Sequence, residues 1–180
     1  MIVQDSKIEA FEYVLFKLVE WYNEECSFTE TNDISTLKAL KLLFFVSSVN
    51  TIKESKDTLL DSPFNNFVAM PYGHVESDIY DAIKKDSLVN TLIKNNSTQI
   101  EKEDFIIKLP IELRAKIDTS IESLKQINRK LIKLTAFELV ELSHRWFSWK
   151  INYQKALANG DFSHNISISE IKNEDKIYQI

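Results

Sequence analysis

Glycine is almost absent from this 180-residue chain, which contains only Gly73 and Gly160. A dinucleotide-binding fingerprint needs three closely spaced glycines, and a phosphate-binding P-loop or the nucleophile elbow of a serine hydrolase needs two. These three kinds of site are therefore excluded. Glycine also supplies the positive φ angles of tight hairpins, so its scarcity disfavours a β-barrel or β-sandwich.

The composition is typical of one globular domain. Hydrophobic residues make up 44% of the chain, charged residues 27%, and the net charge is −5. Cys26 is the only cysteine, which leaves no internal disulfide and no thiolate zinc cluster. The first residues lack a signal-peptide pattern, and the longest strongly apolar run, 42–46, is too short to span a membrane. We therefore expect a cytoplasmic protein, a single domain over residues 1–180, with no membrane partner.

Two segments of the first half have helical patterns. Apolar residues recur at steps of three and four over residues 7–25, and Ser6 is a suitable N-cap, which predicts an amphipathic helix. A second helix is predicted from Ser35 or Thr36 past Val49. Its segment LKALKLLFFV is apolar on nearly all sides, which is typical of a central helix covered by its neighbours.

The rest of the chain predicts more helices and two short strands. FVAM, residues 67–70, and residues 105–109 are the candidate strands. The predicted helices cover residues 75–86, residues 110–133, a segment opened by a capping box at Thr135 and Glu138, and a short final segment capped by Ser169. The predicted fold class is mostly α with a small β element (α+β): a single compact helical domain with a short two- or three-stranded sheet.

Three stretches, in this order, resemble a known family. They are LKALKLLFFV (37–46), NFVAMPYGHVESDIY (66–80) and LVELSHRWFSW (139–149). Together they resemble the Panacea domain of the SocA-like antitoxins, over roughly residues 35–175. The resemblance implies a mostly helical antitoxin encoded beside a toxin in bacteria or their phages. It also implies that the partner is a cognate protein toxin, whose identity does not follow because the toxins of this family differ widely.

One residue departs from the family pattern. The family usually has Tyr-Gly-Pro-Val, whereas this chain has His74 at the proline position. Histidine retains a backbone N–H and can titrate, whereas proline would fix φ. We expect His74 in a loop that enters a helix. Replacing it with proline is then expected to preserve the fold if φ is already about −65°.

The candidate partner-binding residues are at the predicted helix entry and near the C-terminal tryptophans. Aromatic residues are enriched among the side chains that dominate interface energies, and these segments also carry the resemblance. The predicted set is Tyr72, Gly73, His74, Val75, Glu76, Trp146 and Trp149. No catalytic, cofactor-binding or metal-binding residues are predicted, because the three histidines show no metal-ligand spacing.

Three alternatives remain open. The protein could be a proteolysis adaptor that delivers the toxin to a protease. It could instead bind or convert a small molecule with His74 or His144, although a buried, hydrogen-bonded His144 is the simpler interpretation. A DNA-binding repressor would use the basic stretch 125–133, but with three arginines and a net negative charge nucleic acid is not the expected partner.

Overall fold

The computed structural model describes residues 2–26, 31–94 and 96–179, which contain seven α-helices and two small antiparallel sheets. The helices are α1 (Ile2–Glu25), α2 (Thr36–Ser48), α3 (Ser77–Lys84), α4 (Ile111–Ile127), α5 (Ala136–His144), α6 (Phe147–Asn159) and α7 (Ile168–Asn173). The strands are β1 (Phe67–Met70), β2 (Gly73–Glu76), β3 (Thr91–Lys94), β4 (Ser97–Ile100) and β5 (His164–Asn165). Two 3₁₀-helices, η1 (Asp104–Ile107) and η2 (Leu131–Lys133), flank α4.

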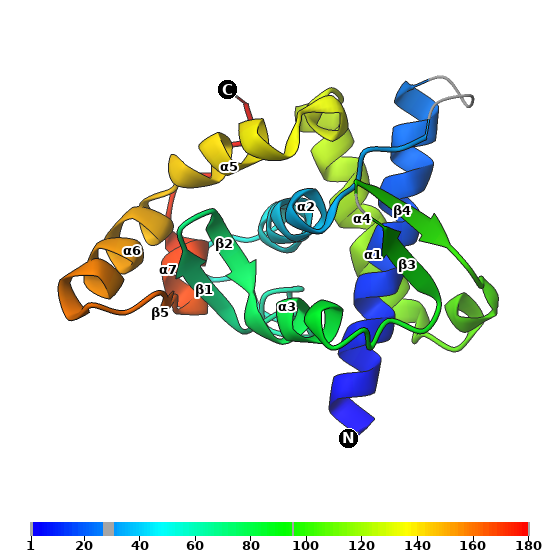
Figure 1. Ribbon diagram of the computed structural model, residues 1–180, viewed down its shortest axis with the longest axis horizontal. Helices are drawn as coiled ribbons and strands as arrows, with labels where there is room; N and C mark the ends of the chain where they lie inside the picture. The colour runs from blue at the N-terminus through cyan, green and yellow to red at the C-terminus, as the bar shows by residue number, and fades with distance from the viewer. Residues whose placement is uncertain (1, 27–30, 95, 180) are drawn as a thin grey trace.

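Helix α2 is at the centre of the molecule, as its apolar sequence predicts. Ser35 caps it by accepting a hydrogen bond from the backbone N–H of Lys38 (3.3 Å). Every residue from Lys38 to Ser48 is buried. Figure 1 shows α2 nearly end-on, with α1 and α4 on one side and α5 and the β1–β2 hairpin on the other.

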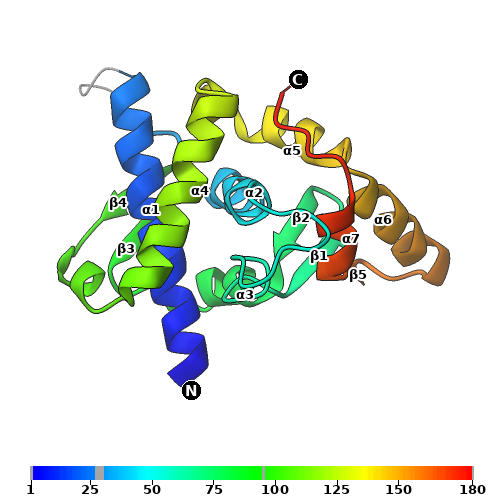
Figure 2. The same ribbon diagram turned by 180° about the vertical axis from the view of Figure 1, so that it is seen from behind.

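The larger sheet has the strand order β2-β1-β5. Strands β1 and β2 form a hairpin whose two-residue turn is Pro71 and Tyr72, with Ala69 opposite His74. The second sheet is the β3–β4 hairpin, which lies beside α1 and away from the first sheet (Figure 2). The C-terminal segment returns to the core, where Tyr178 packs edge-on against Phe45 and Trp146.

The predicted fold class is confirmed, but several predicted elements are wrong in detail. Residues 104–107 form η1 rather than a strand, and the partner of β1 is the adjacent segment 73–76. Helix α4 ends at Ile127 instead of residue 133. The capping box at Thr135 and Glu138 is present. The helix it opens ends at His144, however, and the chain bends before α6 starts.

Two predicted caps also differ from the structure. Helix α1 already includes Ser6, so this residue is not its N-cap. The final helix is capped by Ser167, which forms a capping box with Glu170, and not by Ser169. In the described part of the chain, no helix is both long and apolar enough to cross a membrane.

Candidate functional site

The turn of the β1–β2 hairpin is held in a conformation that requires glycine. Gly73 has φ +95°, and a Cβ placed there would lie 2.4 Å from the Ser143 Oγ. The backbone of the turn is therefore pressed against α5. Tyr72, immediately before this glycine, has 57% of its surface exposed.

His74 follows in β2 and is fully buried. Its ring lies flat against Phe44, with 3.7 Å between the ring centroids. Nδ1 is 2.9 Å from the Ser143 Oγ and Nε2 is 2.8 Å from the Ser148 Oγ. Burial holds the pKa of His74 well below 6.5, and the nearby Lys41 lowers it further. The neutral ring therefore links β2 to both α5 and α6.

The position of His74 corrects the prediction of a residue in a loop or on the surface. Its backbone N–H donates to the Ser143 Oγ at 3.1 Å. The substitution His74→Pro would remove this donor together with both ring contacts. We therefore expect it to destabilise the protein by about 3 kcal/mol or more instead of being tolerated, which thermal or urea unfolding would measure. An unchanged unfolding free energy would contradict this placement.

Two buried charges fix the strand that contains His74. Lys41 of α2 is fully buried and donates to the backbone carbonyl of His74. Burial lowers the pKa of Lys41 to about 7. Glu76, at the end of β2, receives hydrogen bonds from Lys7 (2.7 Å) and from the backbone N–H of Ile79 (2.9 Å). Burial raises the pKa of Glu76, while the bond from Lys7 opposes that rise.

The outer side of the hairpin turn is held by aromatic residues of α5 and α6. His144 Nε2 is 3.1 Å from the Pro71 carbonyl oxygen, and Trp149 Nε1 donates to the Met70 carbonyl at 2.8 Å. The His144 and Trp149 rings stack at 3.8 Å, and Trp149 in turn stacks on Tyr153 at 5.2 Å. Burial lowers the pKa of His144, and the bond to Pro71 opposes this effect.

Two aromatic side chains next to this stack are exposed. Tyr72 and Phe137, which is 67% exposed, meet edge-on with their ring centroids 6.5 Å apart. Phe137 and His144 are seven residues apart on α5, and they therefore share one side of that helix. We call this set the aromatic surface: Tyr72, Phe137, His144, Trp149 and Tyr153.

The predicted partner-binding residues divide into two groups. Tyr72 is exposed and Trp149 is partly exposed, and both belong to the aromatic surface. The other five are buried and support the turn from behind: Gly73, His74, Val75, Glu76 and Trp146. Trp146 packs against Phe44 and donates from Nε1 to the Ile177 carbonyl at 3.0 Å. Phe137 and Tyr153 are not among the residues predicted from sequence, because aromatic residues at helical spacing usually belong to the core.

Two basic residues of the stretch 125–133 form ion pairs within the molecule. Lys125 forms ion pairs with Glu24 (2.8 Å) and Glu122 (3.2 Å), and Arg129 pairs with Glu25. The pairs with Glu24 and Glu25 attach α4 and the residues that follow it to the C-terminal end of α1. Among the described residues, no group of three or more His, Cys, Asp or Glu side chains is arranged to hold a metal ion.

A comparison with known protein families matches residues 40–150 to the family described as antitoxin SocA-like, Panacea domain. This match covers more than half of the chain. The chain belongs to the SocA-like antitoxin family. The resemblance predicted from the three sequence stretches is thereby confirmed. Searches of curated proteins and of solved structures each found no significant match.

The SocA-like region contains most of the site described above. It includes most of α2, the β1–β2 hairpin, α5 and the start of α6, and therefore both sides of the His74 environment. Helix α1 and residues 151–179 lie outside the matched region. They nevertheless complete the site, because Lys7 of α1 bonds to Glu76 and Tyr153 of α6 extends the aromatic stack.

Proposed function

We propose that this SocA-like protein is an antitoxin that neutralises a toxin encoded next to it by binding it directly through the aromatic surface. The observation that carries the proposal is the exposed Tyr72–Phe137 pair beside the half-buried His144–Trp149 stack. Family membership supports a toxin as the kind of partner. The binding mode and the surface are our proposal.

The chemistry of this surface suits a protein partner. Large aromatic side chains bury much apolar area at a low cost in conformational entropy, and they are enriched at interface hot spots. The turn that carries Tyr72 is held by the Trp149–Met70 and His144–Pro71 hydrogen bonds. Little ordering would then be needed on binding, which favours affinity. A specific interface of this kind buries about 800 Å² on each partner.

The test is co-expression with the product of the neighbouring gene, scoring growth rescue and co-purification. The wild-type chain is expected to rescue growth and to co-purify with the toxin. The double variant Tyr72→Ala/Phe137→Ala is expected to weaken binding about 1,000-fold, because two hot-spot side chains contribute about 2 kcal/mol each. Phe162→Ala is the matched control, because Phe162 is 71% exposed and lies outside the aromatic surface.

The results distinguish the alternative mechanisms. Rescue in which the toxin disappears from the lysate would favour a proteolysis adaptor over an inert complex. Equal binding by the double variant and the Phe162→Ala control would place the interface elsewhere. A neighbouring product that is harmless alone and does not co-purify would contradict the antitoxin proposal.

A further inference from the structure

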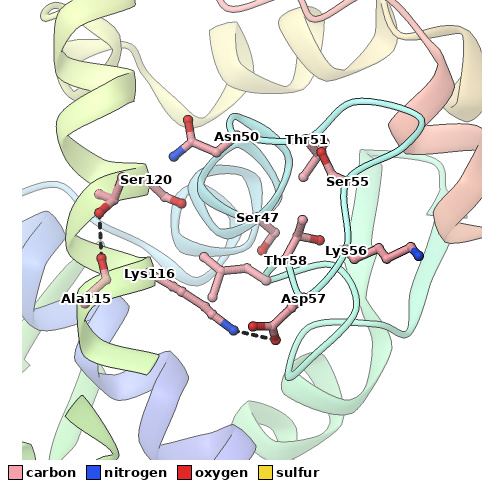
Figure 3. A pocket seen from close by; sticks show the side chains of 12 residues that line it. Ser47, Asn50, Thr51, Ser55, Lys56, Asp57, Thr58, Ala115, Lys116 and Ser120 are labelled. Atoms are coloured by element: carbon pink, nitrogen blue, oxygen red, sulfur yellow. Dashed lines mark hydrogen bonds and ion pairs between the residues drawn. The ribbon is translucent and has the colours of Figure 1, made fainter. Parts of the chain in front are cut away.

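A second site lies between α4 and the segment that follows α2, on elements that the aromatic surface does not use. Here a cavity of about 400 Å³ is bordered by the end of α2, residues 50–59 and one side of α4. Cavities that bind small molecules typically measure about 300–1,000 Å³. Figure 3 shows Ser120 and Lys116 on α4, across the cavity from Ser47 and Thr58.

Four hydroxyl groups that line the cavity already donate hydrogen bonds to other groups of the protein. Ser47, Thr51 and Thr119 donate to the backbone carbonyls of Leu43 (2.8 Å), Ser48 (2.7 Å) and Ala115 (2.8 Å). Thr58 donates to the Asp61 carboxylate at 2.8 Å. A hydroxyl has one proton and two lone pairs, so these four groups can offer a ligand only acceptors. A ligand must therefore bring its own O–H or N–H donors.

Two further polar side chains are free to adapt to a ligand. Ser120 is 4% exposed and lines the cavity, and its hydroxyl has no hydrogen-bond partner among the described residues. This hydroxyl can therefore donate to a ligand as well as accept from one. The Asn50 amide, which can donate and accept, is exposed and lines the same cavity.

The charges around the cavity favour a neutral ligand. Lys116 at the mouth is neutralised by Asp57, with 2.5 Å between Nζ and Oδ1. The ammonium of Lys56 points away from the other lining side chains (Figure 3). The interior presents hydroxyls, an amide and the apolar Leu59, which is 3% exposed. An anion would face mainly acceptors, and an organic cation would find no free carboxylate.

The loop over the cavity is held in place without a ligand. Ser55 accepts from the Ile52 N–H (2.9 Å), and its carbonyl accepts from Lys172 of α7 (2.9 Å). Asp61 accepts from Thr58 and from Lys172 (2.6 Å). Asp57 has φ +56°, a left-handed conformation that aspartate tolerates at turns. The cavity is therefore pre-formed, which lowers the cost of binding.

We propose that this cavity binds a small neutral molecule with several hydroxyl groups, of the size of a monosaccharide or a nucleoside. The hydroxyl protons of the ligand would be accepted by Ser47, Thr51, Thr58 and Thr119. Ser120 and Asn50 would complete the hydrogen bonds, and an apolar face of the ligand would rest on Leu59. This site is independent of His74 and His144 and of the proposed toxin-binding surface.

Saturation-transfer NMR on the purified full-length protein tests the proposal, with ribose, glucose, adenosine and glucose 6-phosphate as separate probes. Transfer to the neutral probes and weaker transfer to the phosphorylated sugar are expected. Binding of adenosine without free sugars would identify a nucleoside, and binding of a free sugar would identify a saccharide. Absence of transfer to all the neutral probes would overturn the proposal.

Two variants locate the binding. Ala115→Leu places a larger side chain at the cavity wall without changing the backbone carbonyl that Thr119 uses, and it should abolish transfer. Ala158→Leu is its matched control, an exposed alanine on α6. Ser120→Ala should weaken binding about fivefold, the effect of one net hydrogen bond. Circular dichroism checks folding of each variant. Equal transfer by the Ala115→Leu and Ala158→Leu proteins would show that binding occurs elsewhere and would overturn the proposal.

Discussion

Lys41 and His74 are two buried titratable side chains near the centre of the protein, and neither has an acidic partner among the described residues. The carbonyl of His74 accepts from Lys41, and the ring of the same histidine is bound by two serines. Burial lowers the pKa of both side chains. Protonation of either group is therefore more costly in the folded protein than in the unfolded chain, and stability depends on pH.

The pKa of Lys41 predicts the direction of this dependence. It is about 7 in the folded protein against an ordinary 10.5, so the unfolded chain binds more protons between these values. The contribution of Lys41 to stability is complete above pH 10.5 and is lost as the pH falls towards 7, at up to about 1.4 kcal/mol per pH unit. Urea unfolding between about pH 7 and 9 should show the free energy of unfolding rising with pH. The slope should be much smaller in Lys41→Met, and an identical slope would contradict the assignment.

Gly73 should be the more sensitive of the two glycines. Gly73→Ala strains a positive φ and places a Cβ 2.4 Å from the Ser143 Oγ, and we expect a loss of about 3 kcal/mol or more. Gly160 is the matched control. It also has a positive φ, +73°, but a Cβ there meets nothing within 4 Å, so Gly160→Ala should cost about 1 kcal/mol. Equal losses in chemical denaturation would show that the contact with Ser143 is unimportant.

At the scale of elements, a single carboxylate attaches the second hairpin to α1. Glu12 is fully buried, and its Oε1 accepts from the backbone N–H groups of Val89 (2.9 Å), Asn90 (2.7 Å) and Thr91 (3.0 Å). Its Oε2 accepts from the Asn90 side chain at 2.6 Å. The start of β3 is therefore fixed by a residue of a helix that lies far away in the sequence.

We expect Glu12→Ala to destabilise the protein by about 3 kcal/mol or more, because three N–H groups lose their acceptor. Hydrogen exchange at Val89, Asn90 and Thr91 should accelerate as well. Glu9→Ala, on the same helix and at a partly exposed position, is the control and should change stability by about 0.5 kcal/mol or less. Unchanged exchange at these three amides would refute the role given to Glu12.

The helices could be predicted from sequence because their signals are local. The spacing of apolar residues in α1 and α2 and the capping box of α5 each lie within one segment. The β3–β4 hairpin was missed because its placement depends on distant polar groups. Glu12 fixes β3, and Asn32 bonds to both the N–H (3.0 Å) and the carbonyl (2.8 Å) of Thr98 in β4.

The candidate site could also be predicted only in part, because some of its features are local in the sequence and others depend on contacts between distant segments. The order of the segments indicated the family, and Tyr72 and Trp149 were selected because aromatics favour interfaces. Burial of His74 and Trp146 could not be deduced, since it depends on how α2, α5 and β2 meet. Exposure of Phe137 was missed as well, because its apolar spacing along α5 resembles that of a core residue.

At the scale of the whole molecule, one core extends beyond the region that matches the family. Among its described side chains, helix α1 contributes eight buried apolar or aromatic ones: Ala10, Phe11, Tyr13, Val14, Leu15, Leu18, Trp21 and Tyr22. Ile166, Ile171 and Tyr178 close the core from the C-terminal side. The matched segment therefore lacks α1 and the C-terminal residues, which both contribute to the core around α2.

A fragment of residues 40–150 is accordingly expected not to fold by itself. It would expose the apolar faces of α2 and α4 and would leave Glu76 without the bond from Lys7. Circular dichroism and the dispersion of amide NMR signals would show a largely unfolded chain, with the full-length protein as the control. A cooperative unfolding transition in the fragment would contradict a single domain over residues 1–180.

The stacking of His144 on Trp149 makes the fluorescence of Trp149 a probe of the aromatic surface. Trp21 and Trp146 are fully buried, so their fluorescence should respond little to events at the surface. Trp149 is partly exposed and lies against an imidazole, so its emission depends on nearby water and on the charge of that ring. A toxin that covers the aromatic surface should shift this emission to shorter wavelengths, and complex formation could be followed in real time without a label.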